Sequence, residues 1–264
     1  FNTIATATGR GQRSHNPREI ITMAGIKSLF RDTAIYGVSS IVGRFINWCL
    51  VPMYTYCFTD AEYGVVTHIY AYVALVLTIL TYGMETGFFR FANHDRWQNP
   101  GQVYTTTLTS IGVSSVLFII AGCLLSADIA EWLECGAHPS FIWMMVIAVG
   151  VDAYTSIPFA YLRYRKRPVR FATLKLINIS LNIGLNLFFI LLCPVIWQKA
   201  PQWIEWFYDP SFGIGYIFMA NLISSLTVLL LLVPEIVAED YSFSPRLLKE
   251  MLRYSFPLLV LGIA

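Results

Sequence analysis

Residues 163–193 read RYRKRPVRFATLKLINISLNIGLNLFFILLC, and this stretch decides the fold class. It begins with a basic segment, 163–170, and continues with 23 residues, 171–193, in which Lys175 is the only charged side chain. A helix of about 20 mostly apolar residues crosses the hydrocarbon core of a bilayer, and Lys and Arg gather in cytoplasmic loops. The stretch therefore predicts a membrane-spanning helix that begins at the cytoplasmic face.

The composition of the whole chain also predicts a membrane protein. Of its 264 residues, 56% are apolar and only 13% are charged, and the mean hydropathy is +0.58. Soluble domains carry about 25% charged residues, so this composition excludes a soluble enzyme, a nucleic-acid binder and a disordered tail. The sequence has no zinc-ligand spacing, phosphate-binding loop, dinucleotide fingerprint or nucleophile elbow. We therefore expect no catalytic residue, metal or cofactor, and a protein that is not an enzyme.

Six stretches have the length and composition of a membrane span. They are residues 33–56, 64–84, 103–125, 141–162, 171–193 and 213–236, and a seventh span begins near 254. The predicted fold is an all-α integral membrane protein with a six-helix N-terminal bundle.

The sequence also suggests how the chain is divided. Residues 1–22 are polar and precede the first Met, Met23, so we expect either a polar N-terminal tail or an upstream read-through that is not native. The six-helix bundle occupies 23–240. Residues 241–264 form a juxtamembrane segment and the start of a seventh helix, and the apolar run at 256–264 suggests that this helix is truncated.

Charged and aromatic residues in the loops indicate the orientation. Basic and acidic loops alternate along the chain. Of the 18 Lys and Arg residues, 16 fall on one side of the membrane, Lys199 falls on the other, and Arg44 lies deep inside a span. This bias predicts a multi-pass protein with a cytoplasmic N-terminus. Several Trp residues gather on the acidic side, as in an aromatic belt. The segment 197–207 is either a short helix on the outer leaflet or a loop with anchoring Trp residues.

Polar side chains inside the spans are the candidates for function. Stripes of Ser, Thr and Ala are typical of helix packing in membranes. Arg44, Asp152 and the Asn residues of the fifth span differ, because an ion at the bilayer centre costs several kcal/mol and faces a partner or a water-filled cavity. Two arrangements stay open and are compatible with each other: a hydrated cavity shared by several helices, and a structural ion pair between Arg44 and Asp152.

These considerations give two groups of candidate residues. The substrate-binding candidates are Arg44, Asn47, Lys175, Asn178, Asn182 and Asn186. Asp152 and Glu85 are candidates for an ion pair with Arg44 or Lys175, or for a proton relay. A guanidinium in a cavity suits an anionic substrate, because its fixed donors match phosphate oxygens. We interpret Arg90 and the segment 163–170 as the ordinary basic flank of the spans.

Four segments carry motifs in a familiar order. Residues 50–64, LVPMYTYCFTDAEYG, and 83–91, GMETGFFRF, end the first two spans. Residues 152–172 contain D-A-x-x-x-I-P, L-R and R-F-A, and residues 248–258 read LKEMLRYSFPL. Together, over about residues 23–264, they resemble polysaccharide flippases of the multidrug/oligosaccharidyl-lipid/polysaccharide (MOP) superfamily, which is MATE-like in architecture.

The resemblance implies both a fold and an activity. It implies two helix bundles that rock about a central site, of which this chain supplies the N-terminal one. The implied substrate is a polyprenyl-diphosphate-linked oligosaccharide, flipped across the bacterial inner membrane for O-antigen, capsule or exopolysaccharide synthesis. Arg44 is the implied contact to the diphosphate. The three Asn residues of the fifth span, Asn178, Asn182 and Asn186 (the Asn stripe), are the implied contacts to sugar hydroxyls. The implied partners are this anionic lipid, membrane lipids and a polysaccharide polymerase complex, with no nucleic acid.

Three other functions compete with this interpretation. A drug or cation antiporter of the same superfamily would favour acidic and aromatic residues in its cavity. A membrane enzyme of polysaccharide assembly would carry larger loops or a cluster of His, Asp and Glu at the interface. A structural scaffold would have little need of buried charges.

Overall fold

The computed structural model describes residues 37–38, 41, 45, 48–94, 99–133 and 138–263, with side chains up to 260. In this part of the chain all regular secondary structure is helical. The proposed tail, 1–22, and the candidates Arg44 and Asn47 lie outside the described residues.

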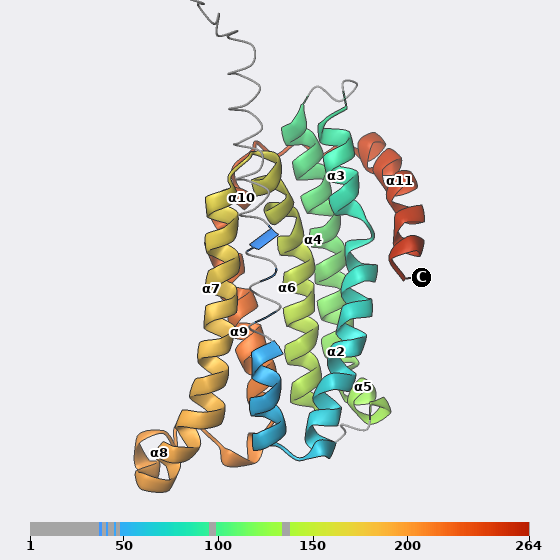
Figure 1. Ribbon diagram of the computed structural model, residues 1–264. Coiled ribbons are helices and arrows are strands. Elements are labelled where there is room, and N and C mark those ends of the chain that lie inside the picture. Colours follow the sequence, from blue (N-terminus) through green and yellow to red (C-terminus); the bar gives the residue numbers. More distant parts are fainter. Residues whose placement is uncertain are drawn as a thin grey trace, which may run out of the picture.

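The helices follow one another with short connections (Figure 1). After a helical segment at 48–57 come α2 (Asp60–Thr81), α3 (Met84–Ala92), α4 (Pro100–Leu124), α5 (Ser126–Trp132), α6 (Pro139–Tyr164), α7 (Pro168–Leu187), the π-helical turn η1 (Phe188–Leu192), α8 (Cys193–Lys199), the 3-10 turns η2 (Pro201–Trp203) and η3 (Pro210–Phe212), α9 (Gly215–Leu231), α10 (Val233–Ile236) and α11 (Pro245–Ile263).

Four helical stretches in the described part are long and apolar enough to cross a membrane. They are Asp60–Ala92, Pro100–Leu124, Pro139–Tyr164 and Pro168–Lys199. They contain the predicted spans at 64–84, 141–162 and 171–193, and all of the span at 103–125 except its last residue. The predicted span at 213–236 is also helical, but it divides into α9, with 17 residues, and the short α10. Pro234 lacks the N–H that an unbroken helix would donate there.

Local sequence signals set the helix ends. Thr59 caps α2, because the backbone N–H of Glu62 donates to Thr59 Oγ1 at 3.3 Å and the Glu62 carboxylate accepts from the backbone N–H of Thr59 at 2.9 Å. α2 stops at Tyr82 and Gly83, whose φ angles are +33° and +68°. Glycine adopts such a left-handed conformation without strain. This turn separates α3 from α2 and places Glu85 in the first turn of α3.

The helices pack around α6, which is the most deeply buried of the four long apolar stretches. α2 and α4 pack against α6, and α9 lies between α6 and α7 (Figure 1). α11 lies along the outside of the bundle against α3, α2 and α4. A Cβ on Gly87 would lie 2.6 Å from Ser255 Oγ, so a larger residue there would force α11 or the Ser255 side chain to shift.

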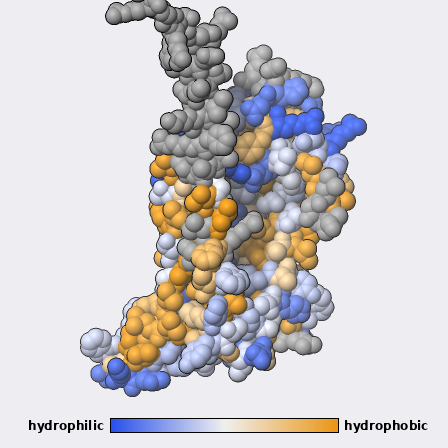
Figure 2. All heavy atoms as spheres, in the orientation of Figure 1, coloured by the Kyte–Doolittle hydropathy of each residue, from blue (hydrophilic) through white to orange (hydrophobic). Residues whose placement is uncertain are grey.

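The two ends of the bundle differ in character. The end that carries α3 and α10 has the basic residues Arg90, Arg165 and Arg170. The opposite end, with α5 and α8, exposes Trp132, Trp203 and other aromatic side chains. Figure 2 shows hydrophilic residues near α3 and at the tip of α8, with apolar residues along the flank between them. Charged and apolar surfaces are therefore arranged as a bilayer requires.

Candidate functional site

A polar cavity of about 520 Å³ opens within the apolar bundle. α2, α3, α6, α7 and α9 all contribute to its wall. Its lining residues are Leu77, Thr78, Thr81, Glu85, Asp152, Thr155, Ser156, Phe159, Arg163, Phe171, Lys175, Asn178 and Val228. Ionisable groups in an otherwise apolar membrane bundle are costly unless they face water or a partner, so this cavity is the candidate functional site.

An ion pair between Glu85 of α3 and Arg163 of α6 forms part of the cavity wall near the basic end. The two side chains are 42% and 32% exposed, so water reaches both of them. The guanidinium also lies 5.3 Å from the ring centroid of Phe89 and 5.8 Å from that of Phe171. Two helices that are far apart in sequence are thus joined by a charge pair on the cavity wall.

This ion pair differs from the sequence prediction. The sequence predicts Arg44 or Lys175 as the partner of Glu85 and treats Arg163 as part of a basic flank, whereas the structure gives Arg163 both the pair and a place in the cavity. α6 continues to Tyr164, so Arg163 still lies on a helix and not in a loop. Arg163 lies seven residues after Ser156, so both side chains lie on one face of α6. This spacing can be seen in the sequence and could have identified Arg163 as a cavity residue.

Asp152 of α6 and Lys175 of α7 face the same cavity and are close enough to interact electrostatically. The ammonium of Lys175 lies 4.1 Å from the ring centroid of Phe159. Among the described residues, no carboxylate lies within ion-pair distance of Lys175, whereas Arg163 is occupied by Glu85. Lys175 is therefore a cation available to a ligand. The predicted pairing of Asp152 with Arg44 concerns a residue outside the described part.

The Asn stripe of α7 divides into two parts. Asn178 lines the polar cavity and also a smaller neighbouring cavity of about 320 Å³. Asn182, Tyr70 and Asn221 line the smaller cavity as well. These amides present donors and acceptors next to the charged groups.

Asn186 is buried between helices and contributes to their packing. It is 1% exposed, accepts a 3.0 Å hydrogen bond from Tyr54 Oη and donates a 2.8 Å bond to the Asn182 carbonyl. It lines neither of the two cavities. Its contacts join α7 to the helical segment at 48–57, and its Nδ2 also donates a 3.2 Å bond to Asn182 Oδ1. Of the other candidates, the structure therefore brings Asn182 into contact with Asn186, behind the lining of the smaller cavity.

The polar cavity combines two carboxylates, two cations and the amide of Asn178. The described residues contain no group of three or more His, Cys, Asp or Glu side chains placed to hold a metal ion. The arrangement therefore favours recognition of a polar or charged ligand inside a membrane bundle.

Comparison with known proteins identifies no family for this chain, so its function is argued from the fold and the polar cavity. No protein-family model matches the chain, and neither a curated protein nor a solved structure matches it. The part of the chain that the structure describes is all-helical and contains four apolar helices long enough to cross a membrane.

Proposed function

We propose that the protein is a transporter that flips a polyprenyl-diphosphate-linked oligosaccharide across the bacterial inner membrane for the synthesis of cell-surface polysaccharide. In this proposal the described helices belong to a six-helix, MATE-like bundle with a cytoplasmic N-terminus. A polysaccharide polymerase complex would receive the flipped lipid.

The observation that carries the proposal is the position of Lys175. Its ammonium lines a large polar cavity in an apolar bundle, and among the described residues no carboxylate pairs with it. A diphosphate carries negative charge and several acceptor oxygens, so hydrogen bonds to a cation are charge-assisted. Asn178 and Asn182 lie along the same helix and offer amide groups that suit sugar hydroxyls.

The charge distribution at the cavity also supports a path for an anion. Arg163 lies between Lys175 and the basic end of the bundle, where Arg165 and Arg170 are exposed. Basic residues concentrate on the cytoplasmic side of membrane proteins. A diphosphate lipid made on that side would therefore meet positive charge first and Lys175 deeper in the cavity.

The test is an export assay with three Lys variants in the full-length protein. Lys175→Ala removes the cation, Lys175→Arg retains a charge, and Lys199→Ala changes an exposed Lys at the opposite end. A charge-assisted hydrogen bond contributes about 1.5–3 kcal/mol, so we expect Lys175→Ala to lower the flipping rate about tenfold or more. Lys175→Arg should retain part of the activity, and Lys199→Ala should behave as the wild type.

Two outcomes would count against the proposal. One is normal export by a well-inserted Lys175→Ala protein. The other is the pattern of a cation antiporter, in which Asp152→Asn abolishes resistance to a cationic drug while Lys175→Ala retains it. Comparing both variants in both assays separates the two transporters, because their substrates require opposite charges in the same cavity.

A further inference from the structure

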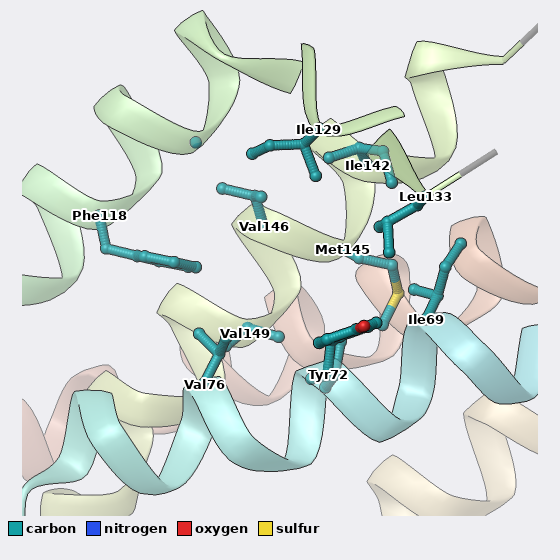
Figure 3. A pocket seen from close by; sticks show the side chains of 12 residues that line it. Ile69, Tyr72, Val76, Phe118, Ile129, Leu133, Ile142, Met145, Val146 and Val149 are labelled. Atoms are coloured by element: carbon teal, nitrogen blue, oxygen red, sulfur yellow. The ribbon is translucent and has the colours of Figure 1, made fainter. Parts of the chain in front are cut away.

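A second pocket lies apart from the polar cavity, between α2, α4, α5 and α6, and has a volume of about 140 Å³ (Figure 3). Its lining includes Ile69, Val76, Phe118, Ile142 and Val149. In Figure 3 these side chains converge on a common space from helices on several sides. Tyr72 has the only polar side chain in the lining.

The pocket, called the slot below, lies where α2, α4 and α5 pack on α6. α6 forms its floor, α2 and α4 form its walls, and α5 packs on α6. Ile129 and Leu133 line the slot near α5, where the rings of Tyr72 and Trp132 lie 5.4 Å apart. A Cβ on Gly122 would lie 2.6 Å from Val146 Cγ1, so this glycine lets α4 and α6 approach closely at the floor.

The sides of the slot continue into the apolar outer surface of the bundle. α2 and α4 both pack on α6 but contact each other only sparsely. Next to the pocket, Leu75 and Ile79 of α2 and Val116, Leu117 and Ile120 of α4 are each about half exposed or more. Both helices are apolar enough to cross a membrane, so these side chains meet the hydrocarbon of the bilayer.

We infer that this pocket binds the end of an acyl chain from a bilayer phospholipid. Water is a poor occupant, because a buried water needs two to four polar partners and the lining offers one hydroxyl. An apolar cavity of about 150 Å³ holds a molecule the size of benzene. The space therefore accepts the last few carbons of one chain but neither a head group nor a fused ring system.

Bulk phospholipid fits the position better than the isoprenoid chain of the proposed substrate. α2 presents Ile69 and Val76 to the pocket and Thr78 and Thr81 to the polar cavity. The two spaces thus lie on different faces of the same helix, and a ligand headgroup held at Lys175 is separated from the slot by α2. Phospholipid, in contrast, surrounds the exposed side chains beside the pocket at all times.

The experiment is photocrosslinking of the protein in nanodiscs that contain a phosphatidylcholine with a diazirine at the end of one acyl chain. Peptide mapping should place adducts on pocket residues such as Tyr72 and Met145. Val76→Phe fills the pocket, and Val116→Phe makes the same change on the lipid-facing surface of α4. We expect Val76→Phe to lower pocket adducts at least several-fold and Val116→Phe to leave them unchanged.

A third variant keeps the test decisive if Val76→Phe does not fold. Phe118→Ala enlarges the pocket and should increase the adducts on its floor. Three results would overturn the inference: adducts confined to the outer surface, pocket adducts that do not respond to Val76→Phe or Phe118→Ala, and preferential labelling of the pocket by a diazirine polyprenyl phosphate. Lipid labelling does not depend on transport, so its outcome is independent of the flippase proposal.

Discussion

Removing the ion pair between Glu85 and Arg163 should reveal how strongly the cavity wall is stabilised by charge. We consider a double-mutant cycle of Glu85→Gln, Arg163→Gln and the combined variant. Each single variant leaves one charge of the pair on the wall without its partner, whereas the double variant leaves none. The coupling energy is the difference between the effect of the double variant and the sum of the single effects.

The expected coupling follows from the exposure of the two side chains. Two unit charges 4 Å apart interact by about 1 kcal/mol in water and about 4 kcal/mol at an effective dielectric constant of 20. Both side chains are more than 30% exposed, so solvent screens the pair, and we expect a coupling of about 1–2 kcal/mol.

Equilibrium unfolding in mixed micelles of SDS and a mild detergent measures the four free energies of the cycle. The pair of Arg165 and Glu239 is a matched control, because its charged atoms are 3.8 Å apart and its side chains are 50% and 27% exposed. Solvent-accessible ion pairs contribute about 0.2–1 kcal/mol. The control pair is about as exposed as the pair of Glu85 and Arg163, but its charges are farther apart, so its cycle should give the smaller coupling. Additive effects of Glu85→Gln and Arg163→Gln would refute the reasoning.

Three further changes test the packing around the cavity. Tyr54→Phe removes the hydroxyl that donates to Asn186 at 3.0 Å and should lower the free energy of unfolding by about 1 kcal/mol, with an unchanged value as the contrary result. Gly87→Val should displace α11 and increase its proteolysis, because a Cβ there meets Ser255 Oγ at 2.6 Å; an unaltered cleavage pattern would contradict this contact. Glu235→Gln breaks a 3.1 Å ion pair whose carboxylate side chain is 6% exposed and should cost about 1–2 kcal/mol in SDS unfolding, more than Glu205→Gln on the surface.

The helices could be predicted from sequence because hydropathy and helix caps are local properties. Residues 171–193 are apolar over the length of a bilayer, and α7 with its continuation covers them. The division between α9 and α10 was harder to predict, because Pro234 lies in an apolar run whose hydropathy continues across it.

The candidate site was predictable only where a stripe follows one helix. Lys175 and Asn178 are three residues apart and line one cavity. The role of Asn186, farther along the same stripe, depends on a neighbouring helix. Asn186 accepts a hydrogen bond from Tyr54 across the bundle and contributes to helix packing. The pairing of Arg163 with Glu85 joins residues 78 positions apart, and such a contact follows from the arrangement of helices, which hydropathy does not specify.

The most direct test of the central claim is the reactivity of a cysteine at position 178 in the intact membrane. Asn178→Cys, with the native cysteines replaced, should react with a membrane-impermeant maleimide because the cavity admits water, and polyprenyl diphosphate should slow the reaction. Val116→Cys, on a side chain that is 55% exposed and faces lipid, should react little under the same conditions. Failure of an inserted Asn178→Cys protein to react, or a reaction rate that polyprenyl diphosphate leaves unchanged, would contradict a hydrated cavity that binds an anionic lipid.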